Sequence, residues 1–296
     1  MMRAVFTALI GDYEQLNELT VPPEPGVDRI CLTDNRELVS ASWQVVQIEA
    51  AFPQDPIRSQ RLLKISGHPA LAGYFETLYI DNTVKLLAPV SEILDSWLAD
   101  SDIAIPTHCF RASIFDEFQE VLASRLDSRE RFVEQLDHYS AHYPEALGLR
   151  PFWNGIIARR QSPAVDTLGK VWSQHVLRYS RRDQLSLTVA IDISGSAVRR
   201  MEINNYSSPI HVWPVFSHRN LETRFSPLPD CFSIAEDLRS DLEGKERELQ
   251  RTSADLGRSE AALAQQSDSL QRMLASSSWK LTRPLRLLKA KFGSRG

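Results

Sequence analysis

Residues 3–13 have the sequence RAVFTALIGDY, an apolar run that stops at a glycine, an acid and a tyrosine. This run predicts a buried β-strand over residues 3–9. Further strands are expected at residues 29–33, 43–48, 77–80, 102–105 and 155–158. Helical patterns lie between them, at residues 57–66, 91–98, 113–126, 128–142, 164–176 and 182–191. Because strands and helices alternate, the sequence predicts an α/β domain with a mostly parallel sheet.

The composition is that of a soluble globular protein. The chain has 296 residues, of which 43% are hydrophobic and 24% charged, so it can bury a sizeable core. Its net charge of −4 argues against a general affinity for nucleic acid. The apolar run Ala4–Ile10 is too short for a signal peptide or a membrane span. The three cysteines lie far apart and form no disulfide framework, which favours a cytoplasmic protein.

The chain divides into a domain over residues 1–233, a helix over 234–275 and a basic tail over 276–296. In the helix, leucines recur every seven residues, and the positions three residues after them are polar, at Lys245, Thr252, Ser259 and Gln266. A tight coiled coil needs both core positions apolar. We expect a long amphipathic helix that pairs weakly with itself, as a homo-oligomer, or with a partner. The alternative is a solvated helix with a leucine stripe.

The tail alternates apolar and basic residues. Residues 279–296 carry six lysines or arginines and no acid, together with Trp279. A basic amphipathic segment with a tryptophan favours anionic membrane surfaces. The alternative is a disordered basic tail.

Polar residues follow four of the predicted strands, in the motifs Gly11-Asp12-Tyr13, Thr33-Asp34-Asn35, Asp81-Asn82-Thr83 and Pro106-Thr107-His108. Glycine-rich dinucleotide and P-loop motifs are absent from the sequence. Each of the four motifs alone is a common turn or helix cap. Together at one sheet edge they favour a site for a metal, a ribose or a phosphate.

Two basic groupings support such a site. Arg58, Arg61 and Lys64 recur every three residues of a predicted helix, and we place them on one face, where they could meet a diphosphate. The alternative is a solvated helix face. The second grouping, RRDQ at residues 181–184, precedes an apolar run. Here the alternative role for Asp183 is in the first turn of a helix capped by Ser180.

Seven segments in this order resemble the TOD1/MUCI70 glycosyltransferase-like domain family, over roughly residues 3–220. They are VFTALIGDYEQL (5–16), CLTDN (31–35), RSQRLLK (58–64), YIDNTVKL (79–86), IPTHCFRASIFDE (105–117), WNGIIARR (153–160) and YSRRDQLSL (179–187). The resemblance implies a GT-A-like, Rossmann-like fold that binds a nucleotide sugar. The implied donor-binding residues are Thr7, Asp12, Tyr13, Asp34, Arg58, Arg61, Lys64 and Asp81.

The resemblance also implies a divalent metal, Mn²⁺ or Mg²⁺, held by a DxD-type motif. Asp81 occupies the first position of that motif, but Thr83 stands where the second carboxylate belongs. One carboxylate holds such an ion poorly without further ligands. His218 is a candidate extra ligand. The basic residues of the predicted helix could instead neutralise the diphosphate without a metal.

On the acceptor side, the resemblance implies that Asp183 and Gln184 are the catalytic Asp-Gln pair near the sugar and acceptor. Asp183 would take the proton of the acceptor hydroxyl. The residues implied to shape donor or acceptor binding are His108, Arg111, Asn154, Trp172 and Arg182. The tail SSSWKLTRPLRLLKAKF resembles the end of many bacterial surface-polysaccharide glycosyltransferases.

These resemblances imply a glycosyltransferase that is peripheral on the inner membrane face. It would act on a surface-glycan or lipid-linked acceptor. The alternative is a non-catalytic scaffold that recruits other synthases through its helix.

Overall fold

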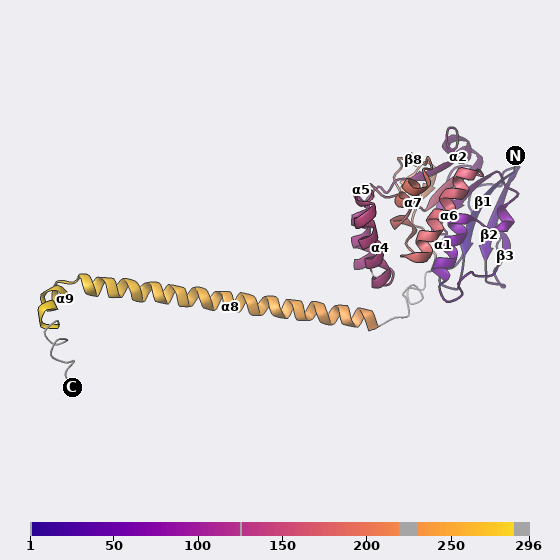
Figure 1. The fold of residues 1–296 in the computed structure, drawn as a ribbon. Coiled ribbons are helices and arrows are strands. Elements are labelled where there is room, and N and C mark those ends of the chain that lie inside the picture. The colour runs from indigo at the N-terminus through magenta and orange to yellow at the C-terminus, as the bar shows by residue number, and fades with distance from the viewer. Residues whose placement is uncertain (1, 125, 219–229, 287–296) are drawn as a thin grey trace. The chain divides into compact units, whose positions relative to one another are not determined.

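The computed structural model describes residues 2–124, 126–218 and 230–286; within the last range, the side chains of 230–238, 240 and 241 are not described. The chain divides into two compact units, at residues 227 and 228. The first unit is an α/β domain, and the second contains a long helix, α8 (Figure 1).

A seven-stranded sheet in the order β3-β2-β1-β4-β7-β6-β8 forms the centre of the first unit. Its strands are β1 Arg3–Leu9, β2 Val27–Thr33, β3 Gln44–Gln47, β4 Glu76–Ile80, β6 Ile103–Pro106, β7 Ile156–Arg160 and β8 Arg199–Met201. Only β7 runs antiparallel to its neighbours, β4 and β6. The predicted α/β class with a mostly parallel sheet is therefore confirmed. Three short strands form a second, antiparallel sheet: β5 Lys85–Leu86, β9 Ser207–Ser208 and β10 His211–Val212.

Helices cover both faces of the large sheet (Figure 1). On one face, Phe6 and Tyr79 pack against α1, α6 and α7, while on the other Val5 and Leu78 pack against α2. This alternation of neighbouring side chains between faces is the property of a β-strand that buries both sides. The helices are α1 Pro56–Ser66, α2 Val90–Trp97, α6 Pro163–Arg178 and α7 Leu187–Ser194.

A third apolar cluster joins α3 Ile114–Ala123, α4 Arg129–His142 and α5 Pro144–Leu147 around Phe118 and Tyr139. Ser113 caps α3, where its side chain and that of Asp116 form a reciprocal capping box. This cap explains why α3 begins where the sequence predicts it.

The structure departs from the predicted elements in two ways. The helix expected over residues 182–191 is split into a 3₁₀ turn, η2 Asp183–Leu185, and α7. Asp183 therefore does not lie in the first turn of a capped α-helix. The sequence analysis also missed β5, β8, β9 and β10, together with η1 Pro69–Leu71 and the single-turn helix α5. Each has two to four residues, too few to show a periodic pattern.

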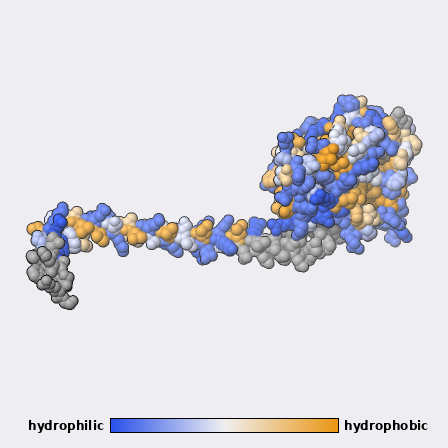
Figure 2. Space-filling view, viewed as in Figure 1, coloured by the Kyte–Doolittle hydropathy of each residue, from blue (hydrophilic) through white to orange (hydrophobic). Residues whose placement is uncertain are grey.

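In the second unit, α8 spans Asp230–Ala275 and α9 spans Ser277–Leu281. The long helix therefore begins four residues before the predicted start at residue 234. Hydrophobic residues recur along an otherwise hydrophilic helix (Figure 2), and Leu242, Leu249, Leu256, Leu263 and Leu270 are all well exposed. In the parts of the chain that the structure describes, no helix is long and apolar enough to cross a membrane.

Candidate active site

A cavity of about 310 Å³ opens where α1, η2 and the end of β4 meet. It lies at the carboxyl ends of the parallel strands, where ligands bind in open α/β sheets. Nine of the predicted site residues line this cavity: Arg61, Lys64, Asp81, His108, Arg111, Asn154, Arg182, Asp183 and Gln184. The sequence segments that carry them are far apart, and the fold brings them together.

Asp183 is the centre of one half of the cavity. Its carboxylate is only 2% exposed and lies 2.9 Å from the ammonium of Lys64 and 3.3 Å from Nε of Arg61. Asn154 donates a third contact, from Nδ2, at 3.2 Å. Burial alone would raise the pKa of Asp183, but the attraction of Lys64 and Arg61 outweighs it and lowers the pKa to about 2. Asp183 is therefore a carboxylate at neutral pH.

Lys64 bridges two carboxylates. Its Nζ, besides contacting Asp183, lies 3.4 Å from Oδ1 of Asp81. Tyr79, which precedes Asp81 by two residues and so lies on the same side of β4, donates its hydroxyl to that oxygen at 2.6 Å. The Lys64 ammonium also lies 5.2 Å from the centre of the Tyr79 ring. Lys64 is 2% exposed, so a full charge is held out of water by these partners.

Arg61 carries a further positive charge into the same half of the cavity. Burial would lower the pKa of Arg61, but Asp183 and Asp81 more than compensate and hold it above its usual range. Tyr13, which does not line the cavity, also acts electrostatically on Arg61 and on Tyr79. These contacts fix two cations beside the carboxyl end of β4.

Glu117 is the centre of the other half. This side chain, 2% exposed, accepts from Arg182 Nη2 at 3.1 Å and from Arg111 Nε at 3.3 Å. Arg182 also donates to Oε1 of Gln184 at 2.8 Å. The sequence analysis includes Glu117 in the family segment at residues 105–117 but predicts no role for it. Its position after a capping box explains this omission, because acids in the first turn of a helix are common.

His108 lies beside Glu117, with 4.0 Å between its Nε2 and Oε2 of the glutamate. Burial, together with the guanidinium groups of Arg111 and Arg182, lowers the pKa of His108 to about 3. The imidazole is therefore neutral at physiological pH, and it contributes a dipole rather than a charge.

Several predicted residues do not line the cavity. Thr7 is buried in β1, on the side that faces α2. Asp34 accepts a hydrogen bond from the backbone of Gly11 at 2.9 Å, which holds the turn after β1, where Gly11 has a φ of +72°. Asp12 is exposed and contacts Asn35. Asp34 and Asp12 therefore belong to the loops that follow β1 and β2.

Trp172 acts on the cavity from outside it. The buried ring donates from Nε1 to the carbonyl oxygen of Asp183 at 2.9 Å. This contact anchors the backbone of η2 against α6 and so positions the Asp183 side chain.

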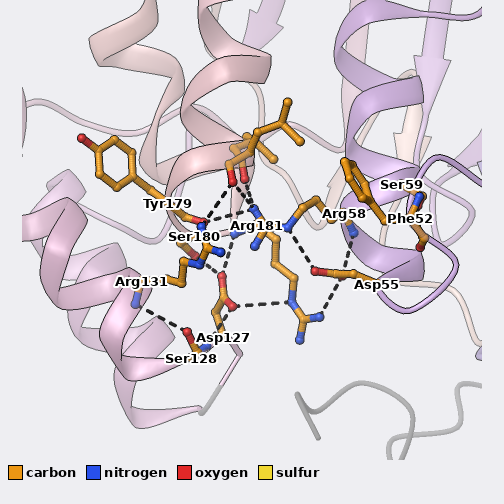
Figure 3. A network of polar contacts seen from close by, with 12 residues as sticks. Phe52, Asp55, Arg58, Ser59, Asp127, Ser128, Arg131, Tyr179, Ser180 and Arg181 are labelled. Atoms are coloured by element: carbon orange, nitrogen blue, oxygen red, sulfur yellow. Dashed lines mark hydrogen bonds and ion pairs between the residues drawn. The ribbon is translucent and has the colours of Figure 1, made fainter. Parts of the chain in front are cut away.

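Arg58 does not share the environment of Arg61 and Lys64. It contacts Asp55 and donates to carbonyl oxygens at the end of α6, including that of Tyr179 at 3.2 Å (Figure 3). Each step of three residues turns an α-helix back by about 60°, so Arg58 points about 120° away from Lys64. Arg58 therefore stabilises the negative end of α6.

The same network holds the loop that leads to Asp183 (Figure 3). Arg181 contacts Asp55 at 3.0 Å, and its backbone N–H donates to Asp127 at 2.6 Å. Ser180, predicted as a helix cap, donates its hydroxyl to the same Asp127 carboxylate at 2.7 Å. These contacts tie α1 and the segment before α4 to the RRDQ loop.

The predicted metal ligands, Asp81 and His218, each have another contact in the structure. His218 is exposed and stacks edge-on against Phe216, and Thr83 accepts a hydrogen bond from Trp213 at 3.2 Å. Within residues 2–124, 126–218 and the described side chains beyond, no three His, Cys, Asp or Glu side chains form a metal-binding group. The cation that contacts Asp81 in the structure is Lys64.

Aromatic lining residues were missed entirely by the sequence analysis. Phe110, Trp153 and Trp213 also line the cavity. Trp213 follows β10, which pairs with β5 next to the Asp81 motif. A two-residue strand leaves no periodic signal, so nothing in the sequence links this tryptophan to Asp81.

The fold and the cavity define an α/β protein in which paired cations and carboxylates meet at the carboxyl ends of parallel strands, the position where such sheets bind ligands. Residues 28–208 match the TOD1/MUCI70, glycosyltransferase-like domain family. The match covers more than half of the chain, which therefore belongs to this family. A search among curated proteins found no match.

Proposed function

We propose that the protein transfers a sugar from a nucleotide-sugar donor to a glycan or lipid-linked acceptor, in the cavity between α1 and η2. The observation that carries this proposal is the pair of cations, Lys64 and Arg61, fixed beside Asp81 at the end of β4. Cations at this position would stabilise the leaving diphosphate of a nucleotide sugar, which carries negative charge.

In the proposed reaction, the acceptor oxygen forms a bond to the anomeric carbon as the bond from that carbon to the diphosphate breaks. The electron pair of the broken bond leaves on the diphosphate, next to Lys64 and Arg61. The proton of the acceptor hydroxyl passes to an acidic side chain of the cavity.

The resemblance gives Asp183 the role of proton acceptor, but its contacts favour a different one. Lys64 and Asn154 contact one oxygen of the carboxylate and Arg61 the other, and a pKa of about 2 makes it a weak base. We therefore propose that Asp183 holds the two cations in position.

A divalent ion, Mn²⁺ or Mg²⁺, would add positive charge at the diphosphate if Asp81 held it. The side chains around Asp81 favour a different arrangement, because the Lys64 ammonium already contacts this carboxylate and Thr83 replaces the second acid. The proposal is that Lys64 and Arg61 supply the charge that a metal supplies in metal-dependent transferases.

Calorimetric titration with UDP-, GDP- and dTDP-sugars tests the proposal. One nucleotide class should bind to the full chain, with similar affinity in excess Mn²⁺ and in excess chelator. Binding that requires Mn²⁺ would contradict the proposed role of the two cations. A folded protein that binds none of these donors would instead support a non-catalytic scaffold that recruits other synthases through α8.

The exposed leucines of α8 favour self-association as an additional property. Five leucines at seven-residue intervals form one stripe on a helix of 46 residues. A second copy of the same helix offers a matching stripe, and burying both removes apolar surface from water. We propose a parallel pairing of two copies, weakened by the polar residues at the companion positions.

Replacing Leu256 by glutamate should convert a dimer into a monomer, because the change puts a charge in the middle of the stripe. Light scattering after size-exclusion chromatography measures the mass directly. Arg258→Glu, which changes an exposed side chain outside the stripe, is the matched control. A parent chain that is monomeric at high concentration would contradict the pairing.

The tail is proposed to hold the protein on the inner face of the membrane. Trp279 stacks under Arg286, and Leu281 and Leu285 are exposed; residues 287–296 lie outside the described part of the chain. The protein should sediment with anionic phosphatidylglycerol vesicles and should not sediment with neutral phosphatidylcholine vesicles. Reversing the charges of Lys280, Arg283 and Arg286 should weaken this binding more than about tenfold. Equal binding to both vesicle types would contradict the proposal.

A further inference from the structure

Four aromatic side chains form a continuous shelf along one side of the cavity: Phe110, Trp153, Tyr206 and Trp213. The rings of Phe110 and Tyr206 stack with centres 5.0 Å apart, and those of Phe110 and Trp213 lie nearly parallel, 6.3 Å apart. Trp153 meets the edge of Trp213 at 5.4 Å. Three of the four also line the cavity that contains Asp183. The aromatic shelf is therefore a wall of the same site.

Hydrogen bonds connect Trp213 of the aromatic shelf to the loop that carries Asp81. Trp213 donates from its indole nitrogen to the Thr83 hydroxyl at 3.2 Å, and the Thr83 carbonyl accepts from the backbone of Val215 at 2.9 Å. The backbone of Trp213 also donates to the carbonyl of Tyr206 at 2.9 Å. These bonds hold Trp213 next to the loop that carries Asp81 and next to Tyr206.

The position of Trp153 in the aromatic shelf depends on Gly155. A Cβ atom on Gly155 would overlap the indole ring of Trp153. Because Gly155 lacks one, the Trp153 ring lies flat against the start of β7 and packs on His211 at 5.3 Å. The Asn154-Gly155 pair therefore serves both the Asp183 half of the cavity and the aromatic shelf: Asn154 contacts Asp183, and Gly155 leaves room for the Trp153 ring.

The outer rings are open to solvent. Tyr206 is 48% exposed, while Phe110 and Trp213 are half-buried. Such flat apolar faces next to polar side chains are uncommon on a surface that binds nothing. Arg111 lies over the Phe110 ring and pairs with Glu120 at 2.8 Å, which adds hydrogen-bonding groups at the rim.

We propose that the aromatic shelf binds a pyranose ring of the acceptor. The C–H face of a pyranose is apolar and packs on aromatic rings, while its hydroxyl groups hydrogen-bond to a polar rim. The inference rests on the proposed function, and it adds the class of acceptor: a glycan, whose terminal sugar lies on Trp213 and the exposed Tyr206 beside it, with a hydroxyl directed into the cavity.

Titration of the full chain with cellobiose, lactose and N,N′-diacetylchitobiose, followed by tryptophan fluorescence, tests the inference. At least one disaccharide should bind to the parent saturably. Trp213→Ala should weaken that binding about tenfold, because it removes a stacking face. Trp213→Phe, which keeps an aromatic face, should lose less.

Tyr206→Ala provides a second variant, whose exposed side chain can be removed without disturbing the core. It should also weaken the disaccharide. The inference would be overturned if both alanine variants bound the disaccharide as the parent does. It would also be overturned if no disaccharide bound saturably to the parent, with or without nucleotide. Either result would count even if nucleotides bind. Sugar binding that depends on Trp213 in a protein that binds no nucleotide would support the shelf and overturn the donor site.

Discussion

Lys64→Met should reduce the affinity for the bound nucleoside diphosphate about a hundredfold. A hydrogen bond to a charged group contributes up to about 3 kcal/mol, which corresponds to that factor. The loss should be large because Lys64 is buried, so the ammonium is already desolvated and directed at the cavity. Calorimetric titration of parent and variant with the same nucleotide measures the change.

Removing this cation also takes a partner from Asp183, so the fold must be checked. Breaking a buried ion pair costs about 3 kcal/mol of unfolding free energy, although Arg61 and Asn154 remain in contact with the carboxylate. Lys64→Arg keeps a positive charge and should retain part of the affinity. Lys170→Met, at an exposed position of α6, is the matched control. Full nucleotide affinity in a folded Lys64→Met protein would rule out the proposed role.

Most of the charged residues that line the cavity could be predicted from the sequence. Asp81 and His108 were predicted as site residues because both follow apolar strands, and parallel strands end at one edge of a sheet. Arg61 and Lys64 were predicted from their spacing, but the same spacing wrongly grouped Arg58 with them. Helix geometry gives only the angles between the side chains of Arg58, Arg61 and Lys64 around the axis of α1. Which of them faces the cavity depends on the position of α6, which is a tertiary property.

The aromatic shelf shows where sequence reasoning reaches its limit. Phe110, Trp153 and Trp213 come from three separate segments, and short pairings between β5 and β10 bring the last of them to Thr83. Glu117 was hidden for another reason. An acid near the start of a helix has a sufficient local explanation in the helix dipole, and only the approach of Arg182 shows a second role.

Asp183→Asn should leave nucleotide binding intact but slow the transfer of sugar. Asparagine keeps the shape of the side chain but removes the charge that faces Lys64 and Arg61. The cavity then becomes more positive, so the nucleoside diphosphate should bind at least as tightly as to the parent. Transfer should fall about a hundredfold, because the two cations lose the partner that orients them and small displacements of reacting groups are costly. Weaker nucleotide binding, or transfer at the parental rate, would contradict this role for Asp183.

The pH dependence of stability gives an independent measure of the same contacts. In the folded protein the pKa of Asp183 is about 2, below the reference value of 3.8. A depressed pKa stabilises the fold above pH 3.8, and this contribution disappears as the pH falls toward 2. The difference in unfolding free energy between parent and Asp183→Asn should therefore shrink by about 2 kcal/mol over this interval. Chemical denaturation of both proteins at matched pH measures it, with the Lys170→Met protein as reference. A constant difference across the interval would mean that Lys64 and Arg61 do not hold this carboxylate in its charged form.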